Sequence, residues 1–312
     1  MAAQQLVILG GSGFVGSHLL PRLAADGHRI VLLSRNREQH RELSVLPGVT
    51  IRSADVYDDD TLRRRLAGAD AVINLVGILN PRGPHTFQRT HVELTRRLIA
   101  ACRASGVRRL HQMSSLKAGQ GLSQYLKTRG EAEALVKASG LEWTIYQPSV
   151  IFGVGDGLVS RFAALLRRMP LLPLARAKAR MAPTFVGDVA EAIARCVGSD
   201  KLGRRRSFEL YGPEVLTLGE IVRKIRAAAG LRTPIVALPD SLGRLQAQLA
   251  ELLPGKPFSL DNFRSLRTDS VGNADGYAAL GIVPQAFSPW LPILLNESAR
   301  QRRLAAARSL RR

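Results

Sequence analysis

The sequence contains little cysteine, few aromatic residues and few acidic ones. Its 312 residues include 2 cysteines, 5% aromatic residues, and 25 Asp and Glu against 45 Lys and Arg. Cys102 and Cys196 stand among apolar neighbours without the paired spacing of metal ligands, so we expect buried thiols, no disulfide and no metal. The chain also has no run of about 18 to 20 apolar residues that would span a membrane, and no basic segment leading into an apolar leader. A cytoplasmic protein is therefore predicted.

The positive charge, formally +20, comes mostly from arginine. The arginines are scattered through segments of helical pattern and do not alternate with aromatic residues, and no nucleic-acid-binding module is recognisable. We therefore interpret them as solvated helix faces, with an anionic membrane or an acidic partner as the alternative, and expect no nucleic acid. Six arginines and no acid occupy residues 298–312. This basic tail suits either peripheral contact with the inner face of a membrane or a merely soluble terminus.

A glycine-rich loop begins the chain's clearest motif. The apolar run Leu6–Leu9 is followed by glycines at positions 10, 13 and 16 and then by a helix-like pattern. In a strand, loop and helix of this kind, Gly10 permits the turn, Gly13 lets a pyrophosphate approach the backbone, and Gly16 allows close packing. The helix N-terminus favours the phosphates. We predict that a dinucleotide contacts this loop through Gly10, Ser12, Gly13, Phe14, Val15 and Gly16.

Strand-like and helix-like segments alternate along the first half of the chain, which predicts an α/β fold with a doubly wound parallel sheet. We expect residues 1–153, completed by 183–212, to form the dinucleotide-binding domain. Residues 154–182 and 213–295 are expected to form a smaller, mostly helical lobe, and 296–312 the basic tail. In that lobe Leu242, Leu245, Leu249 and Leu252 recur at helical spacing, which favours a core face. The expected buried strands are Arg29–Leu33, Val49–Ala54, Ala71–Val76, Val107–Met113 and Glu142–Gln147.

Residues at the strand ends bear on the choice of cofactor. The second strand ends in Ser34 and Arg35, where NAD-binding sheets usually place a ribose-binding acid. A guanidinium there would pair with a 2′-phosphate, which favours NADP(H) over NAD(H), although a solvated arginine starting the next helix is an alternative. Asp55 and Val56 follow the third strand and suit the adenine, although Asp55 or Asp58 would equally serve as a helix N-cap. Leu75, Val76 and Gly77 follow the fourth strand and are expected near the far half of the dinucleotide.

Several motifs together resemble an atypical extended short-chain dehydrogenase/reductase. They are the glycine loop, Ser114 after the fifth strand, the helix bearing Tyr125, and the stretch Gln147–Gly153. A narrower similarity, to bacterial relatives of the alpha-subcomplex subunit nine of complex I, is carried by Asn74–Leu79, Tyr125–Glu133, Pro183–Ala190, Ser207–Pro213 and Leu238–Leu242. The resemblance covers residues 4 to about 290.

The resemblance implies a nicotinamide site with a serine and a tyrosine. Ser114 would polarise a carbonyl oxygen and Tyr125 would protonate it, while Pro148 and Ile151 would line the cofactor. The family's lysine, four residues after the tyrosine, is Arg129 here, and Lys127 faces another side of the helix. Arginine supplies charge and ribose hydrogen bonds but does not readily release a proton. Ser114 and Tyr125 would therefore either catalyse or merely frame a tightly held cofactor.

Two functions are compatible with an arginine, Arg129, in place of the family's lysine. The first is an accessory protein with structural or sensory NADP(H), tied to quinone or respiratory-chain membranes. The second is a working NADPH-dependent reductase or epimerase-like enzyme acting on a carbonyl of an apolar, quinone-like or isoprenoid-like substrate. Arg129 favours the first, whereas Ser114 and Tyr125 favour the second. His91, at the start of a long helix, is interpreted as a packing or capping residue.

Overall fold

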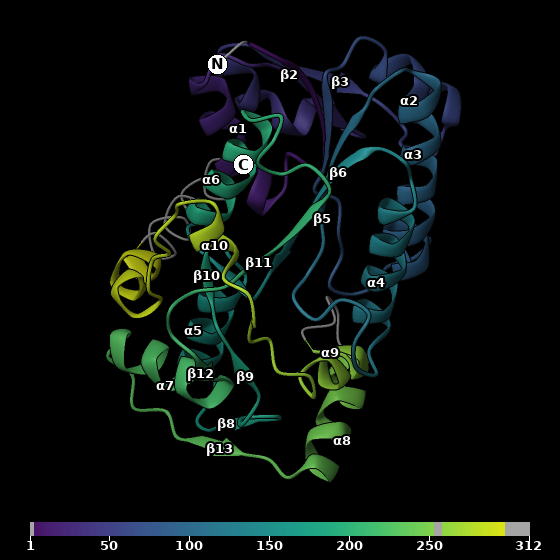
Figure 1. Cartoon of the computed structure of the whole chain (residues 1–312). Helices are drawn as coiled ribbons and strands as arrows, with labels where there is room; N and C mark the ends of the chain where they lie inside the picture. The colour runs from purple at the N-terminus through teal and green to yellow at the C-terminus, as the bar shows by residue number, and fades with distance from the viewer. Residues whose placement is uncertain (1–2, 253–257, 297–312) are drawn as a thin grey trace. The chain divides into compact units, whose positions relative to one another are not determined.

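The computed structural model describes residues 3–252 and 258–296 and divides the chain into two compact units (Figure 1). The first unit comprises Met1–Pro148, Gly187–Leu210 and Gly272–Val283, and the second comprises Ser149–Val186, Tyr211–Val271 and Pro284–Arg312. The basic tail, on which the sequence predicted membrane contact, lies outside the described residues.

The first unit is built on a seven-stranded sheet with the order β11-β6-β5-β4-β1-β2-β3, in which every neighbouring pair is parallel. The predicted doubly wound parallel sheet is thereby confirmed. The ends of these strands lie within two residues of their predicted limits, which is the usual uncertainty of an element boundary. The strands are β1 (Gln5–Leu9), β2 (Arg29–Ser34), β3 (Val49–Ser53), β4 (Ala71–Asn74), β5 (Arg109–Met113), β6 (Glu142–Pro148) and β11 (Arg206–Leu210).

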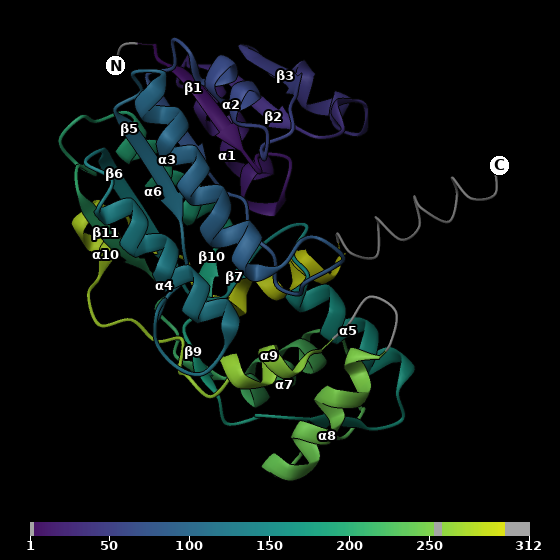
Figure 2. The same ribbon diagram turned by 90° about the vertical axis from the view of Figure 1, so that its right-hand side faces the viewer.

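Helices cover both faces of this sheet. The helices α2 (Asp59–Leu66), α3 (Leu94–Ala104) and α4 (Gln124–Lys137) lie on one face, and α1 (Phe14–Ala25) and α6 (Val186–Val197) lie on the other (Figures 1 and 2). On the first face Leu62, Leu98 and Val136 pack on apolar side chains of β1, β4, β5 and β6. The remaining helical elements of this unit are η1 (Arg37–Val45), the π-helical η2 (Gln88–Glu93) and α10 (Gly276–Ala279).

The sheet changes its winding direction between β1 and β4, which are neighbours in space although β2 and β3 separate them in sequence. The amide of Leu75 continues the pairing by donating to Leu9 O at 2.9 Å. In doubly wound sheets the crevice beyond the strand ends at this switch point is where ligands bind. The loops after β1 and β4 are therefore the first place to look for a site.

The second unit contains α5 (Leu158–Arg168), α7 (Leu218–Ala228), α8 (Asp240–Glu251), α9 (Leu260–Ser265) and η3 (Ser288–Trp290). Three short strand pairs join them: β7 (Ile151–Phe152) with β10 (Thr184–Phe185), β9 (Arg180–Met181) with β12 (Leu216–Thr217), and β8 (Leu172–Leu174) with β13 (Ile235–Ala237). Its core includes fully buried Phe152, Ile221 and Phe287.

The boundary between the units differs from the expected one at residue 153. The chain leaves the first unit after Pro148, because β7 pairs with β10 and not with the large sheet. Residues 272–283, expected in the smaller lobe, belong to the first unit. They are held there by the carboxylate of Glu209 on β11, which accepts from the amides of Asn273 and Ala274 at 2.6 and 3.0 Å.

The leucine stripe of α8 is not a core face, so this expectation was wrong. Leu242, Leu245, Leu249 and Leu252 are 50%, 49%, 58% and 82% exposed. The buried face of α8 instead carries Gly243 and Ala247. Small residues were needed there because a Cβ on Gly243 would lie 3.0 Å from the Ala175 side chain and 3.1 Å from the Phe263 ring.

Candidate functional site

The glycine loop has the geometry that a pyrophosphate cradle requires. Gly10 has φ +74°, a left-handed conformation that favours glycine, and a Cβ there would lie 2.8 Å from the backbone nitrogen of Val76. Gly13 is the N-cap of α1 and makes no side-chain cap hydrogen bond. The first amides of the 12-residue helix, including those of Phe14 and Val15, are consequently not covered by a capping side chain. These features fit a dinucleotide phosphate.

Gly16 sets how closely α1 approaches the loop, because a Cβ there would overlap the backbone of Gly11. The close contact between Gly10 and the Leu75–Val76 backbone also brings the loop after β1 against the loop after β4. The predicted residues Gly10, Ser12, Gly13, Phe14, Val15, Gly16, Leu75 and Val76 thus lie around the switch point.

Other predicted site residues lie at or after the ends of β2 and β3, at the same edge of the sheet. Ser34 ends β2, and Arg35 follows it with an exposed side chain whose Nη1 lies 2.7 Å from Nε2 of His85. Asp55 accepts from the amide of Tyr57 at 2.9 Å in a local turn, and the half-buried Val56 packs against the core. Asp58, and not Asp55, is the N-cap of α2, where it accepts from the Thr61 amide.

Arg129, on α4, lies buried against Gly77, which follows β4, and Met113 at the end of β5, with only 5% of its surface exposed. Its Nη1 donates to Met113 O at 2.9 Å, and its Cζ lies 5.5 Å from the centroid of the Tyr125 ring. A Cβ on Gly77 would overlap the guanidinium, so this glycine makes room for the arginine. Within the described chain Arg129 forms no ion pair with a carboxylate, and its Nε has no hydrogen-bond partner. A buried cation with spare donors is thus available next to Gly77 and Met113.

Ser114 lies at the end of β5 as predicted, but its hydroxyl is committed elsewhere. Its Oγ donates to Oε1 of Glu133 at 2.6 Å, and both residues are buried. Glu133 also accepts from Nε2 of Gln147 at 2.7 Å and pairs with Lys137 at 3.2 Å, which identifies the carboxylate as the acceptor. A serine has one hydroxyl proton. Ser114 therefore has no proton left with which to polarise a carbonyl oxygen.

Tyr125, on the first turn of α4, is half-buried in a group of rings. Its centroid lies 6.0 Å from Phe87 and 5.6 Å from His91. Burial, with a smaller contribution from the charge of Arg129, lowers the pKa of His91 to about 2, so this imidazole is neutral. His91 Nδ1 lies 2.9 Å from Thr128 Oγ1, which agrees with the packing role expected for it.

Two further predicted cofactor residues belong to different units of the chain. Pro148 ends β6 in the first unit, and its carbonyl accepts from the Leu116 amide at 2.8 Å. Ile151 lies on β7 in the second unit, where it pairs with Thr184.

Sequence reasoning missed Glu133 and His85. Glu133 stands within the Tyr125–Glu133 motif, four residues after Arg129, so its place on the buried side of α4 was readable from spacing. His85 stands in an irregular loop, where no periodicity indicates what the ring contacts.

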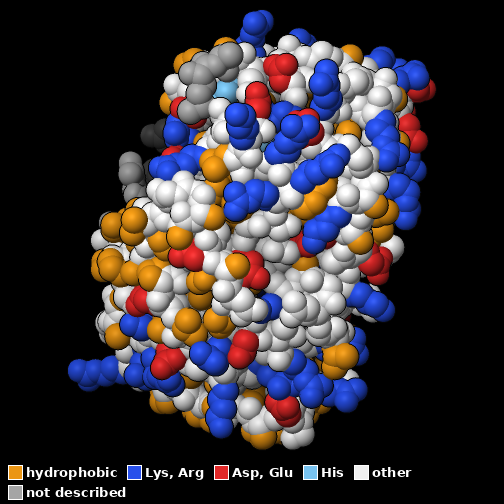
Figure 3. All heavy atoms as spheres, in the orientation of Figure 1, with side chains coloured by type: hydrophobic (Ala, Val, Ile, Leu, Met, Phe, Trp, Pro, Cys, Tyr) orange, Lys and Arg blue, Asp and Glu red, His pale blue; other side chains and the backbone are white. Residues whose placement is uncertain are grey.

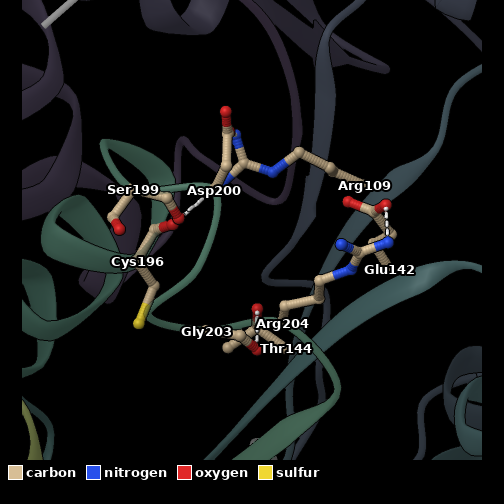
Figure 4. A pocket seen from close by; sticks show the side chains of 8 residues that line it. All are labelled: Arg109, Glu142, Thr144, Cys196, Ser199, Asp200, Gly203 and Arg204. Atoms are coloured by element: carbon tan, nitrogen blue, oxygen red, sulfur yellow. Dashed lines mark hydrogen bonds and ion pairs between the residues drawn. The ribbon is translucent and has the colours of Figure 1, made fainter.

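A small pocket lies at the opposite, amino-terminal edge of the sheet (Figure 4). Arg109 donates there to the carbonyls of Cys196 and Val197 at 2.9 and 3.0 Å, near the end of α6, and pairs with Asp200 at 3.0 Å. The volume of this pocket, about 10 Å³, has room for roughly one water molecule, so the pocket is not a cofactor site. Burial raises the pKa of the Cys196 thiol to about 11 and that of the Cys102 thiol to about 12, as expected of inert buried cysteines.

Charged side chains of both signs lie on the face of the molecule shown in Figure 3. On the face shown in Figure 3, Lys and Arg side chains are spread out with acidic side chains between them. None of the described helices is long and apolar enough to cross a membrane. The described residues also contain no group of three or more His, Cys, Asp or Glu side chains arranged to hold a metal.

Comparison with known proteins agrees with this geometry. Residues 10–157 match a protein-family model described as NAD(P)H-binding. The match begins in the glycine loop and extends past β6, so this stretch of the chain is similar to NAD(P)H-binding domains. The chain is 26% identical over 295 residues to subunit 9 of the NADH dehydrogenase [ubiquinone] 1 alpha subcomplex of Arabidopsis thaliana, which covers 89% of this chain and 73% of that protein.

Two further similarities concern reductases. The chain is 29% identical over 239 residues to a ceramide reductase of Caulobacter vibrioides, covering 75% of this chain and 74% of that enzyme. A solved structure of an NADPH-dependent quinone oxidoreductase of Escherichia coli with NADPH has the same fold, with a TM-score of 0.75 at 20% identity over 93% of this chain and 99% of that one.

Proposed function

We propose that this protein holds NADP(H) as a long-lived ligand and serves as an accessory protein of quinone-linked respiratory membranes. The observation that carries the proposal is the 2.6 Å hydrogen bond from Ser114 to Glu133. It leaves Ser114, the serine predicted to act with Tyr125, without a hydroxyl proton for polarising a carbonyl oxygen. The similarity to a complex I subunit supports the same role.

The presence of Arg129 predicts a low rate of turnover. When bound, the cofactor would supply a hydride, and Tyr125 would supply the proton to the reduced oxygen. The positive charge of Arg129 favours the tyrosinate, but a guanidinium does not release a proton and is bulkier than the family's ammonium. Because Arg129 is buried between Gly77 and Met113 O, it has little room to adjust.

The turnover test uses the purified protein. Bound nucleotide is released by denaturation and its redox form identified, and hydride transfer to soluble quinones is then followed. We expect retained NADP(H) and a rate near background. Since general acid–base catalysis contributes about 10² to 10⁴ in rate, Arg129→Lys should raise the rate by about tenfold or more with little change in cofactor affinity. Tyr125→Phe should abolish the rate.

Lys127→Arg is the matched control, because it makes the same kind of change on the exposed side of the same helix. This variant should change neither the rate of hydride transfer nor the affinity for the cofactor. Brisk reduction by the wild type that Arg129→Lys slows would show that the arginine belongs to a working active site, and the accessory role would then be wrong.

The cofactor proposed is NADP(H), with NAD(H) bound less well. Arg35 stands where a ribose-binding acid would otherwise be, and among the described residues it has no carboxylate partner. A charge-assisted hydrogen bond to the 2′-phosphate is worth roughly 1.5 to 3 kcal/mol, or about tenfold to hundredfold in affinity. Fluorescence titration of NADPH and NADH should show this preference in the wild type and its loss in Arg35→Ala. Equal affinities in the wild type would refute it.

A second candidate is an NADPH-dependent reductase acting on a carbonyl of an apolar, quinone-like or isoprenoid-like substrate. The observation that favours it is the packing of Tyr125 against the rings of Phe87 and His91, which covers part of this side chain. The relative named a ceramide reductase points the same way. NADPH oxidation with long-chain ketones and soluble quinones, each with Tyr125→Phe as control, distinguishes it from the accessory role.

Peripheral membrane contact belongs to the same proposal. The six arginines of residues 298–312 would each contribute about 1 kcal/mol near anionic headgroups. Co-sedimentation with anionic liposomes should therefore fall on truncation at residue 297 and on adding salt. If neither the truncation nor the added salt changes liposome binding, the tail does not make the membrane contact.

A further inference from the structure

The contact between Arg35 and His85 joins two segments that are far apart in the sequence. Arg35 follows β2, whereas His85 belongs to the loop after β4, and the strands β4, β1 and β2 are consecutive neighbours in the sheet. The loop therefore reaches from the end of β4 past β1, whose glycine loop begins there, to the end of β2. This path brings a histidine to the position where the sequence places the 2′-phosphate.

The loop fixes the position of His85 at both ends. Arg82 and His85 exchange backbone hydrogen bonds of 3.1 and 3.0 Å across a tight turn that contains Gly83 at φ +52°. Two residues after His85, the buried Phe87 packs against His91 and Tyr125. The half-buried imidazole is thus positioned by a closed turn and by an anchored ring.

The chemistry of the contact leaves one assignment of protons. A guanidinium has no acceptor atom, so Nε2 of His85 accepts from Arg35 Nη1 and the imidazole is neutral. An anion placed between the two groups would replace Nε2 as the acceptor for Arg35. His85 could then take up a proton from water and donate from Nε2 to the same anion. A ribose hydroxyl carries no charge and offers no such exchange.

We propose that His85 is a second ligand of the 2′-phosphate of NADP(H), acting together with Arg35, and that it makes the preference for NADP(H) dependent on pH. The inference rests on the proposed binding of NADP(H) and adds the residue that sets its selectivity. Arg35 lies 2.7 Å from the His85 ring, and Arg82 is the backbone partner of His85 in the turn. A nearby cation disfavours a proton on an imidazole, so only the anionic phosphate, bound between Arg35 and His85, would make that proton favourable.

The experiment titrates NADPH and NADH by fluorescence at about pH 6 and about pH 8, on either side of the range in which histidine usually titrates. In the wild type the ratio of NADPH to NADH affinity should be about tenfold greater at the lower pH, the worth of one charge-assisted hydrogen bond. His85→Gln should abolish this pH dependence and weaken NADPH about tenfold at about pH 6, while NADH binding stays unchanged. Arg35→Gln should weaken NADPH at both pH values.

Arg82→Gln is the control, since it removes a charge from the same turn but keeps the imidazole. It should leave the pH dependence in place. If the wild type binds neither cofactor, the proposed function itself is wrong. If NADPH is preferred and Arg35→Gln removes the preference, but His85→Gln changes neither affinity nor pH dependence, only the role of His85 is wrong.

Discussion

Ser114 and Ser115 are adjacent, buried serines with opposite hydrogen-bonding states. Ser114 donates to the Glu133 carboxylate at 2.6 Å, whereas the Oγ of Ser115 has no partner among the described residues. Removing a hydrogen bond to a charged group costs about 1.5 to 3 kcal/mol, while removing an unsatisfied hydroxyl costs little. Urea unfolding should therefore show Ser114→Ala destabilised by about 2 kcal/mol and Ser115→Ala near wild type. Unchanged stability of Ser114→Ala together with a loss of hydride transfer would restore Ser114 to catalysis.

Gly77 is the residue that admits Arg129 to its buried position. A Cβ there would overlap the guanidinium, and overpacking of this kind typically costs about 1 to 3 kcal/mol. We expect Gly77→Ala to lower the free energy of unfolding and to weaken NADPH binding. In Gly157→Ala the new Cβ would meet only the Arg161 side chain, at 3.7 Å, so NADPH binding should stay at the wild-type level, and any loss of stability should be that of alanine at the N-cap of α5. Wild-type NADPH affinity in a folded Gly77→Ala protein would mean that Arg129 does not contact the cofactor.

The sequence indicated which residues stand at the strand ends but not which way their side chains point. The hydrogen bonding of Ser114 depends on Glu133 of α4, which also accepts from Gln147 of β6. No local sequence pattern predicts that these side chains lie together. The Arg35–His85 contact spans fifty residues, and the loop that carries it has no periodicity.

At the scale of elements, buried strands were predicted well and the orientation of α8 was not. The short apolar runs of β1, β2 and β4, each followed by turn residues or a loop, are typical of strands covered on both faces. A leucine stripe at helical spacing, by contrast, has the same period whether it packs inward or lies exposed, and α8 buries Gly243 and Ala247 instead.

The α8 helix therefore gives a direct test of its orientation. Replacing Leu245 and Leu249 by Gln should change the free energy of unfolding by less than about 0.5 kcal/mol each, as usual for exposed positions. Ala247→Leu should cost about 1 to 3 kcal/mol, because Ala247 is fully buried beside Ala175 and Phe263. Circular dichroism melts compare the variants. Strong destabilisation by the two exposed substitutions, with Ala247→Leu tolerated, would mean that the helix is turned the other way.

At the scale of the whole molecule, buried histidines make stability depend on pH, because burial lowers the pKa of His28, His91 and His111. Burial lowers the pKa of His91 to about 2 and that of His111 to about 3, and the charges of Arg129 and Arg109 act in the same direction. In the unfolded chain a histidine titrates near pH 6.5. At pH values between these pKa values the unfolded state binds more protons than the folded state. The free energy of unfolding is therefore greatest above about pH 6.5 and decreases as the pH is lowered.

At about pH 5 both folded-state pKa values are far below the solution pH, so the loss depends only on the unfolded value and comes to roughly 2 kcal/mol per histidine. Urea unfolding at pH values from about 7 to about 5 should show this decline. His111→Asn removes one of these groups, so the decline should be less steep in this variant than in the wild type, even though its stability at about pH 7 is lower because the Nδ1 contact with Tyr146 Oη at 2.9 Å is also lost. A stability that stays level down to about pH 5, or a slope that is the same in the variant, would show that these imidazoles take up protons while the protein remains folded.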